Sequence, residues 1–276
     1  MGDDAGAAAL TDVAAVETRI DGFYGGRFQL VQPARIGYRS GLDALLLAAT
    51  VSPDARGRLL DAGAGAGAVG FAASVRAPGL TATLLEREPV MAGCARQGLQ
   101  LAANSGLRGR VRVVERDLLE KSAAQAPGED AIGSYDHLLT NPPFRLPSDR
   151  VSPDPLRAAA LNAPSPDFLA GWFRACLSLL RDGGRFAAIL PPAVLPICLE
   201  VLSGRIGGPA LTAIHAGEGE PAMRLVATGR KGSREPLVFL PPRHLFDRDM
   251  TASDFSRAVS EGEAFFGWPD RKGRTH

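Results

Sequence analysis

Residues 136–144, with the sequence DHLLTNPPF, combine a short apolar run with two consecutive prolines. Because proline has no backbone N–H, it cannot donate to the ladder of a central strand, so Pro142 and Pro143 mark an abrupt strand end. The run therefore predicts a short buried strand that delivers Asn141 and Phe144 to its carboxyl end. In an open parallel α/β sheet, that edge is where ligands bind. The alternative interpretation is structural, with the prolines ending a strand and Phe144 filling the core.

The groups at this strand end suit recognition of a flat amine. The amide oxygen of Asn141 and the carbonyl oxygen of Pro142 can together accept both hydrogens of an exocyclic amino group. The ring of Phe144 can stack on the system that carries that group. The predicted reactive residues are Asn141, Pro142, Pro143 and Phe144.

Composition excludes several classes of protein. Of the 276 residues, 45% are hydrophobic, which allows a large core, and a net charge of +1 gives no strong global field. The three cysteines and four histidines show no metal-ligand spacing, so we expect no metal and a reducing compartment. No signal peptide is evident, and prolines interrupt the apolar run 186–202. We therefore expect a cytoplasmic protein without a membrane anchor.

A second constraint lies upstream, where a predicted strand at residues 58–61 runs into the glycine-rich segment 62–70, AGAGAGAVG. Such glycines let backbone amides approach a ligand closely, and the following helix N-terminus favours negative charge. The literal GxGxxG spacing of residues 65–70 does not separate NAD from other nucleoside cofactors. Glu86 ends the next strand, where a carboxylate can bind ribose hydroxyls. Asp117 follows the third strand, either as an acceptor for an adenine amine or as a turn residue.

Strands and helices alternate through the middle of the chain, which predicts parallel strands joined by right-handed crossovers. The segments 211–215, 223–229 and 236–240 have only turns between them and are expected to add an antiparallel part at the sheet edge. We therefore predict an α/β, Rossmann-like fold with a seven-stranded, mostly parallel sheet. Ser165 is expected to cap a helix whose apolar stripe includes Trp172, interpreted as core.

Basic residues accompany the predicted site in two places. Arg145 and Arg150 lie in the long, proline-rich segment 145–166, which we interpret as a lid or substrate loop. Four more lie in the acid-free segment 223–234: Arg224, Arg230, Lys231 and Arg234. These four are compatible with phosphate contact, and equally with a sheet edge protected by charge.

The pairing of the glycine-rich segment with Asn-Pro-Pro-Phe resembles the class I methyltransferases that methylate amino groups with S-adenosylmethionine. Residues 37–49, GYRSGLDALLLAA, are similar to the bacterial tRNA1(Val) adenine-N6-methyltransferases, as is the segment 226–234. The resemblance covers about residues 22–262. It implies S-adenosylmethionine as cofactor, RNA as partner with tRNA expected, and methyl transfer to the exocyclic amine of an anticodon-loop adenine.

The resemblance also implies residue roles. Asp61 would anchor the glycine loop or the methionine amine, Glu86 would bind ribose hydroxyls, and Asp117 would bind the adenine amine. Asp43 would close over the cofactor, although a capping box with Ser40 explains it equally well. The cofactor set expected in full is Arg39, Gly41, Asp43, Asp61, Ala62, Gly63, Gly65, Gly67, Glu86, Arg87, Asp117, Leu118 and Asn141.

Three other activities stay open. A protein-glutamine methyltransferase uses the same amide recognition, usually with tyrosine in place of Phe144. A ribosomal guanine methyltransferase often carries histidine where this chain has Arg145. From another class, an NAD-dependent oxidoreductase fits the glycine loop but leaves residues 141–144 unexplained.

We expect one methyltransferase domain at residues 22–262, between a lead-in and a tail, and leave open whether the protein is a monomer or a homodimer. Its expected parts are a cofactor-closing segment (22–56), a βα core (57–208) and an antiparallel part (209–262). The lead-in covers residues 1–21 and the tail residues 263–276.

Overall fold

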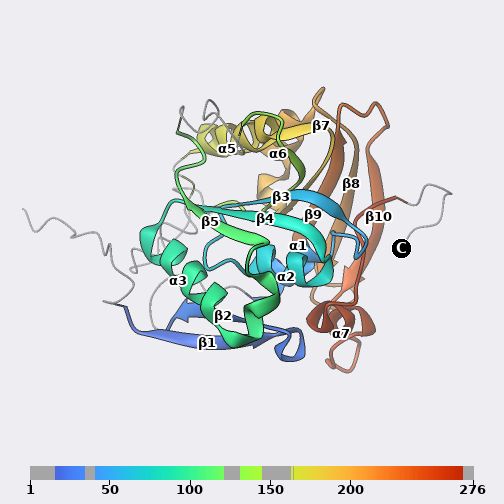
Figure 1. The fold of residues 1–276 in the computed structure, drawn as a ribbon. Coiled ribbons are helices and arrows are strands. Elements are labelled where there is room, and N and C mark those ends of the chain that lie inside the picture. The colour runs from blue at the N-terminus through green and yellow to red at the C-terminus, as the bar shows by residue number, and fades with distance from the viewer. Residues whose placement is uncertain (1–15, 35–40, 121–130, 145–162, 164, 270–276) are drawn as a thin grey trace, which may run out of the picture.

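A mixed sheet with helices on both faces dominates the fold (Figure 1). The computed structural model describes residues 16–34, 41–120, 131–144, 163 and 165–269. The strands of this sheet are β3 (Arg56–Ala62), β4 (Gly79–Glu86), β5 (Val111–Glu115), β6 (Tyr135–Thr140), β7 (Leu180–Leu190), β8 (Ile206–His215), β9 (Ala222–Lys231) and β10 (Val238–His244). Their spatial order is β10-β8-β9-β7-β6-β3-β4-β5.

The C-terminal part of the sheet differs from the sequence prediction. The described sheet has eight strands rather than seven, and β9 alone among them is antiparallel to its neighbours, β7 and β8. The outermost strand β10 pairs with β8 in parallel. Short connections do reverse the chain from β8 to β9 to β10, as expected. Because both edges of β9 are already occupied, β10 crosses to the free edge of β8 and lies parallel to it.

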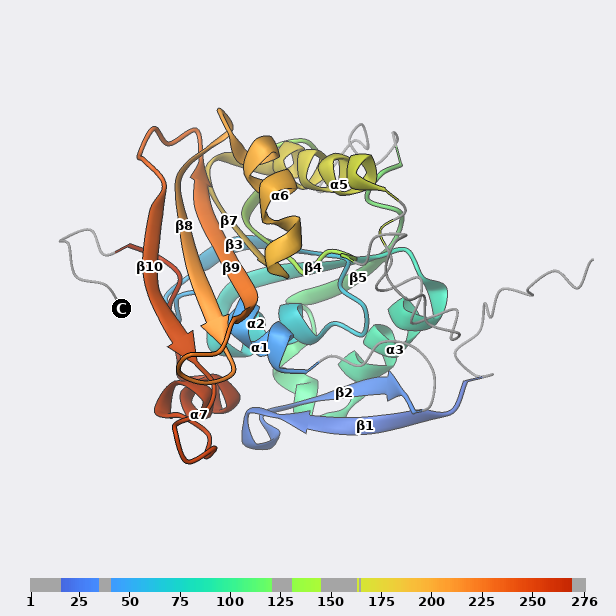
Figure 2. The same cartoon turned by 180° about the vertical axis from the view of Figure 1, so that it is seen from behind.

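Helices cover both faces of the sheet (Figure 2). One face carries α1 (Leu42–Ala48) and α2 (Ala68–Arg76), which bury Leu47 and Phe71 in the larger core cluster. The other carries α5 (Pro166–Leu179) and α6 (Leu195–Leu202), around Phe173 and Phe186. The remaining helices are α3 (Pro89–Gln100), α7 (Asp254–Glu261) and the 3-10 turns η2 (Tyr24–Gly26), η3 (Ala102–Leu107) and η4 (Pro192–Val194).

Two predicted helix caps have different outcomes. Ser165 caps α5 as predicted, because its hydroxyl accepts a hydrogen bond from the backbone N–H of Phe168 at 3.1 Å. Ser40, the expected partner of Asp43 in a capping box, lies outside the described residues.

Within the described ranges, no helix has the length and apolar character that a bilayer crossing needs.

The described fold extends beyond both expected domain borders. A separate antiparallel hairpin, β1 (Thr18–Phe23) with β2 (Phe28–Pro33), begins inside the segment expected to be a lead-in. At the other end, Phe266 is 1% exposed, and the indole N–H of Trp268 donates to the carbonyl of Thr50 at 2.8 Å. Residues expected to form a tail therefore pack against the loop after α1.

Candidate functional site

The carboxyl ends of β3, β4, β5 and β6 meet at one edge of the sheet, where a cleft opens to solvent. The segments that leave these four strands supply most of its lining: residues 63–65, 86–88, 116–118 and 141–144. Helix residues complete it: Ala44, Ala68, Val69, Met91 and Trp172. Parallel strand ends thus bring together residues that are up to 81 positions apart, as the sequence predicted for this edge.

The three expected cofactor glycines that follow β3 divide into two groups. Gly63 and Gly65 line the cleft with positive φ angles of 74° and 57°, a backbone region that glycine adopts without strain. The backbone N–H of Gly65 donates to Glu86 Oε2 at 2.7 Å, which joins the glycine loop to the end of β4. Gly67 instead precedes α2, and a Cβ there would meet Leu84 at 2.9 Å. It therefore allows close packing behind the cleft.

Asp61 lies beneath the glycine loop rather than in the cleft lining. It is 1% exposed, and its Oδ2 accepts a hydrogen bond from the backbone N–H of Gly70 in α2 at 2.8 Å. Burial raises the pKa of the Asp61 carboxyl to about 7, although the bond from Gly70 opposes that shift. Ala62 is also buried. Of the two roles expected for Asp61, this position fits anchoring of the loop.

We expect the stability of the protein to depend on pH through Asp61. Its ordinary pKa of 3.8 is raised to about 7 on folding, so the folded state binds the proton more tightly. Its stabilising contribution is complete below about pH 4 and is lost as the pH rises to about 7, by about 1.4 kcal/mol per pH unit. Urea unfolding from pH 4 to 8 should show this decline relative to Asp61→Asn, and parallel curves for the two proteins would contradict it.

Glu86 presents a carboxylate to the cleft that is already partly bonded. Oε2 accepts from Gly65 N–H at 2.7 Å, and Oε1 accepts from the backbone N–H of Glu88 at 2.8 Å. Burial raises the pKa of Glu86, and these backbone bonds oppose the rise. Each carboxylate oxygen has a second lone pair, so Glu86 can still accept hydrogen bonds from a ligand diol.

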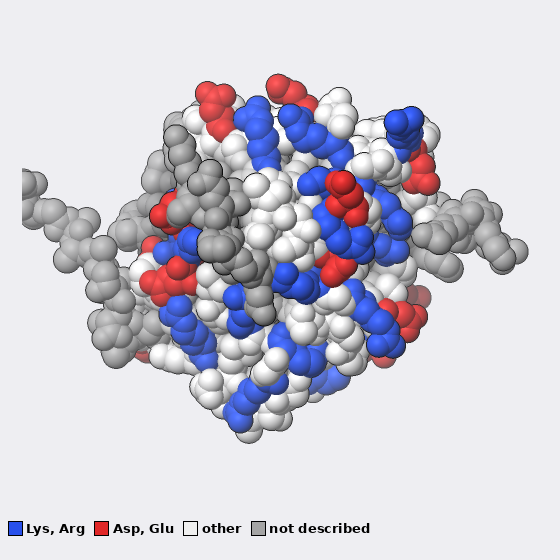
Figure 3. Space-filling model, turned by 45° about the horizontal axis from the view of Figure 1, so that its top comes forward, with Lys and Arg blue, Asp and Glu red and all other residues white. Residues whose placement is uncertain are grey.

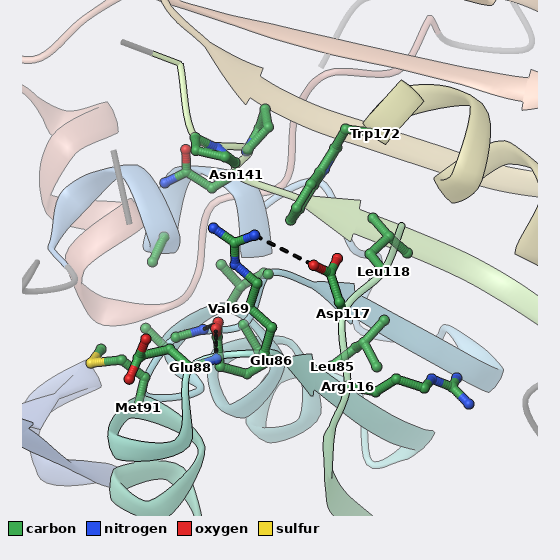
Figure 4. A pocket seen from close by; sticks show the side chains of 18 of the residues that line it. Val69, Leu85, Glu86, Glu88, Met91, Arg116, Asp117, Leu118, Asn141 and Trp172 are labelled. Atoms are coloured by element: carbon green, nitrogen blue, oxygen red, sulfur yellow. Dashed lines mark hydrogen bonds and ion pairs between the residues drawn. The ribbon is translucent and has the colours of Figure 1, made fainter. Parts of the chain in front are cut away.

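An ion pair connects the ends of β4 and β5 at the cleft. Arg87 Nη1 lies 3.4 Å from Asp117 Oδ2, and both residues line the cleft (Figure 4). The other oxygen of Asp117 accepts from the backbone N–H of Leu119 at 2.9 Å, which is the turn role considered for it. Asp117 therefore shapes its turn with one oxygen and faces the cleft with the other. Leu118 adds a buried apolar contact.

Asn141, Pro142, Pro143 and Phe144 all line the same cleft, immediately after β6 ends at Thr140. Figure 4 shows Asn141 and Trp172 on one side of the cleft, with Glu86 and Met91 on the other. The β6 end is fixed from below, because the hydroxyl of Thr140 donates to the carbonyl of Ala62 at 3.0 Å. The predicted reactive residues therefore face the predicted cofactor loop.

Trp172 is a cleft residue that the sequence interpretation assigned only to the core. It is 6% exposed and packs in the core, yet its ring also lines the cleft. Its indole N–H donates to the Thr140 hydroxyl at 2.9 Å, which fixes the ring beside the β6 end. The two residues are 32 positions apart, so the helical pattern around Trp172 carries no signal for this role.

We expect Gly63→Ala to destabilise the protein by on the order of 1–2 kcal/mol, because a Cβ at φ +74° is strained. The added Cβ would also lie 2.9 Å from the indole ring of Trp172. Gly106→Ala is the matched control, since no heavy atom lies within 4 Å of the position that its added methyl group would take. Urea unfolding of both variants measures the difference, and equal stability would contradict the expectation.

Asp43 lies beside the cleft and contacts a residue of the predicted basic segment. Its Oδ2 is 2.9 Å from Arg224 Nε, and the Arg224 guanidinium lies over the ring of Phe144, 5.4 Å from the centroid. Gly41 precedes α1, whose residue Ala44 lines the cleft. Three expected site residues lie outside the described part of the chain: Arg39, Arg145 and Arg150.

The four basic residues of the acid-free segment do not form one patch. In the strand register Arg230 lies opposite Arg185, at the middle of β7, whereas Arg224 lies six residues away along β9, about 20 Å at the usual rise. Lys231 is bound within the protein, because its Nζ donates to the carbonyls of Leu177 and Leu180. Charge protection of an edge does not apply either, since β9 lies inside the sheet.

The wider surface carries side chains of both charges. Basic and acidic side chains are interspersed over the face in Figure 3, in keeping with the net charge of +1. Among the described residues, no three or more His, Cys, Asp or Glu side chains are placed to hold a metal ion.

Comparison with known proteins identifies several relatives. Residues 25–158 match the family model of the methyltransferase small domain. A tRNA1(Val) (adenine(37)-N6)-methyltransferase of Porphyromonas gingivalis is 31% identical over 157 residues, covering 55% of this chain and 58% of that protein. One from Bacteroides thetaiotaomicron is 30% identical over 156 residues, covering 56% and 60%. The chain thus matches little more than half the length of these curated relatives.

The likeness extends to a solved structure. The crystal structure of a predicted O-methyltransferase from Agrobacterium tumefaciens superposes with a TM-score of 0.68 at 30% sequence identity. The match covers 81% of this chain and 98% of that one. The shared region therefore includes nearly the whole of that relative.

Proposed function

This chain belongs to the class I methyltransferases, and from that premise we propose that it methylates the exocyclic amine of an adenine in RNA with S-adenosylmethionine. A tRNA anticodon-loop adenosine is the proposed substrate. The observation that carries the proposal is the position of Asn141 and Phe144, which line the same cleft as Gly63, Gly65 and Glu86. A nucleoside cofactor and a flat amine can therefore meet there.

The cleft residues fit S-adenosylmethionine, which supplies an electrophilic sulfonium methyl when bound. Gly63 and Gly65 have no side chains to block the approach of a ligand to their backbone, and a Cβ on Gly63 would crowd Trp172. We assign these glycines to the methionine and ribose parts and Glu86 to the ribose hydroxyls. Asp117, with Arg87 and Leu118 beside it, is assigned to the adenine of the cofactor.

Asn141 and Pro142 are assigned to activation of the substrate amine. The lone pair of an exocyclic nitrogen is delocalised into its ring, so the free amine is a poor nucleophile. Hydrogen bonds from its two N–H groups to Asn141 Oδ1 and the Pro142 carbonyl hold the nitrogen and localise that pair. No strong base is required, because the proton leaves after transfer. Phe144 stacks on the flipped base, which is worth about 1–3 kcal/mol.

The two-acceptor arrangement favours an amine over a hydroxyl as the group that is methylated. A hydroxyl has one hydrogen and satisfies only one of the acceptors at Asn141 and Pro142. The choice of adenine in tRNA is supported by the curated relatives, which are tRNA1(Val) (adenine(37)-N6)-methyltransferases by name. The solved relative carries a predicted O-methyltransferase name, and the chemistry at the β6 end supports a different acceptor here.

The experiment that tests the proposal is transfer of labelled methyl from S-adenosylmethionine to total RNA from a host lacking this protein. Digestion to nucleosides then identifies the product, and N6-methyladenosine in the tRNA fraction is the expected result. Label in guanosine or in protein would overturn the substrate and keep the cofactor. Thermal stabilisation by NAD, with S-adenosylmethionine without effect, would overturn the methyltransferase chemistry itself.

A further inference from the structure

Phe144 contacts a cation that is itself held on two sides. The guanidinium carbon of Arg224 lies 5.4 Å from the centroid of the Phe144 ring. Arg224 Nε donates to Asp43 Oδ2 at 2.9 Å, and Nη1 donates to the carbonyl of Met223 at 2.8 Å. Because these acceptors bind different nitrogens of the guanidinium, they constrain its plane over the ring.

These contacts join three segments that are distant in the sequence. Asp43 belongs to the first turn of α1, Arg224 to β9, and Phe144 to the segment after β6, while Asp43 and Arg224 are 181 positions apart. The side chains of the ion pair are 24% and 14% exposed, so water screens it less than a surface pair. Arg224 and Asp43 are not among the lining residues of the cleft, whereas Phe144 is.

We propose that Arg224 is a positioning residue that orients the ring of Phe144 for stacking on the substrate base. The inference rests on the proposed function, which assigns Phe144 to that base. A guanidinium within about 6 Å of an aromatic ring is attracted to its face. Arg224 therefore holds Phe144 from outside the cleft, and Asp43 holds Arg224. Ala44, next to Asp43, lines the cleft, so the same contact also ties the α1 wall to the stacking ring.

A direct role of Arg224 in binding an RNA phosphate is the competing interpretation, and it predicts different behaviour. A phosphate contact acts on RNA affinity, so its loss raises KM and lowers the salt dependence of binding. A positioning contact acts on the geometry of the bound base, so its loss lowers kcat. The split between KM and kcat therefore distinguishes the two.

The contact itself is tested without substrate, by 19F NMR of the protein with 4-fluorophenylalanine at position 144. We expect Arg224→Met to shift or broaden the single resonance, and Asp43→Asn to change it in the same direction. Arg96→Met is the matched control, because Arg96 forms an ion pair with Glu115 at the same 2.9 Å and neither residue lines the cleft. Identical spectra for the wild type and Arg224→Met would overturn the inference.

The consequence is tested by steady-state methyl transfer to the RNA that the wild type methylates. We expect Arg224→Met to lower kcat about tenfold, or about 1.4 kcal/mol, with the KM for RNA and S-adenosylmethionine binding within twofold. Arg224→Lys should recover part of the loss. In combination with Phe144→Leu, Arg224→Met should cause no further loss, because it acts through that ring.

Other outcomes separate the inference from the function beneath it. Additive losses in the double variant, or a raised KM with unchanged kcat, would overturn the positioning role. A third outcome is that Arg224→Met changes the 19F resonance but the wild type methylates no RNA. That outcome would overturn the proposed function and the stacking role of Phe144, while the contact between Phe144 and Arg224 would stand.

Discussion

Asn141→Ala is expected to lower kcat for methyl transfer by about 10²–10³-fold while the protein still binds S-adenosylmethionine. The variant loses one of the two acceptors proposed for the substrate amine, so the nitrogen keeps its lone pair delocalised and is no longer held in place. The backbone carbonyl of Pro142 and the stacking ring of Phe144 remain, so RNA binding should change less than kcat. Single-turnover transfer to tRNA measures the rate of the methyl-transfer step. Calorimetric titration measures the binding of S-adenosylmethionine.

A matched control tests whether removing a carboxamide side chain far from the cleft also lowers activity. Gln100→Ala removes an exposed carboxamide at the end of α3, away from the cleft lining, and should keep full activity. If Asn141→Ala turned over at a near-normal rate, the proposed amine activation would be wrong. If it lost cofactor affinity in proportion to activity, Asn141 would belong to cofactor binding, which the sequence also assigned to it.

Glu86→Gln is expected to weaken S-adenosylmethionine binding by about 10- to 150-fold, the effect of losing about 1.5–3 kcal/mol from hydrogen bonds to a charged group. Glutamine keeps one acceptor oxygen for Gly65 or Glu88, but it cannot bond both backbone donors and a ribose diol. Isothermal titration of the wild type and the variant gives the two dissociation constants directly.

The chain offers a matched control for Glu86 on the neighbouring strand. Glu115 pairs in register with Glu86 at the ends of β5 and β4, but it forms an ion pair with Arg96 and does not line the cleft. Glu115→Gln should therefore bind the cofactor as the wild type does. Equal affinity in the Glu86→Gln variant would remove Glu86 from the proposed site.

Protonation gives an independent check on the same carboxylate. Burial raises the pKa of Glu86, so its charged form is lost at a higher pH than that of an ordinary glutamate. Cofactor affinity of the wild type should therefore fall as the pH drops through this raised pKa, whereas the Glu86→Gln variant should show a weaker dependence. A wild-type affinity independent of pH would contradict a role for the charged form.

The sequence by itself determined the parts of this protein that depend on local backbone chemistry. Pro142 and Pro143 end β6 because they lack donors, and the positive φ angles of Gly63 and Gly65 allow the β3 loop to turn under the cleft. Glu86 reaches the same edge because parallel strands share one carboxyl end. These local rules predicted the α/β class and the strand ends that place Glu86, Asp117, Asn141 and Phe144 at the cleft.

Only the tertiary structure decided which distant side chains meet. Three contacts at the site join residues that are 30 to 181 positions apart. They are the hydrogen bond of Trp172 with Thr140, the ion pair of Arg224 with Asp43 beside Phe144, and the ion pair of Arg87 with Asp117. The parallel pairing of β10 follows from which strand edges remain free after β7, β8 and β9 have paired. Such contacts depend on how whole elements pack, and no periodicity or turn signal within a single segment encodes that packing.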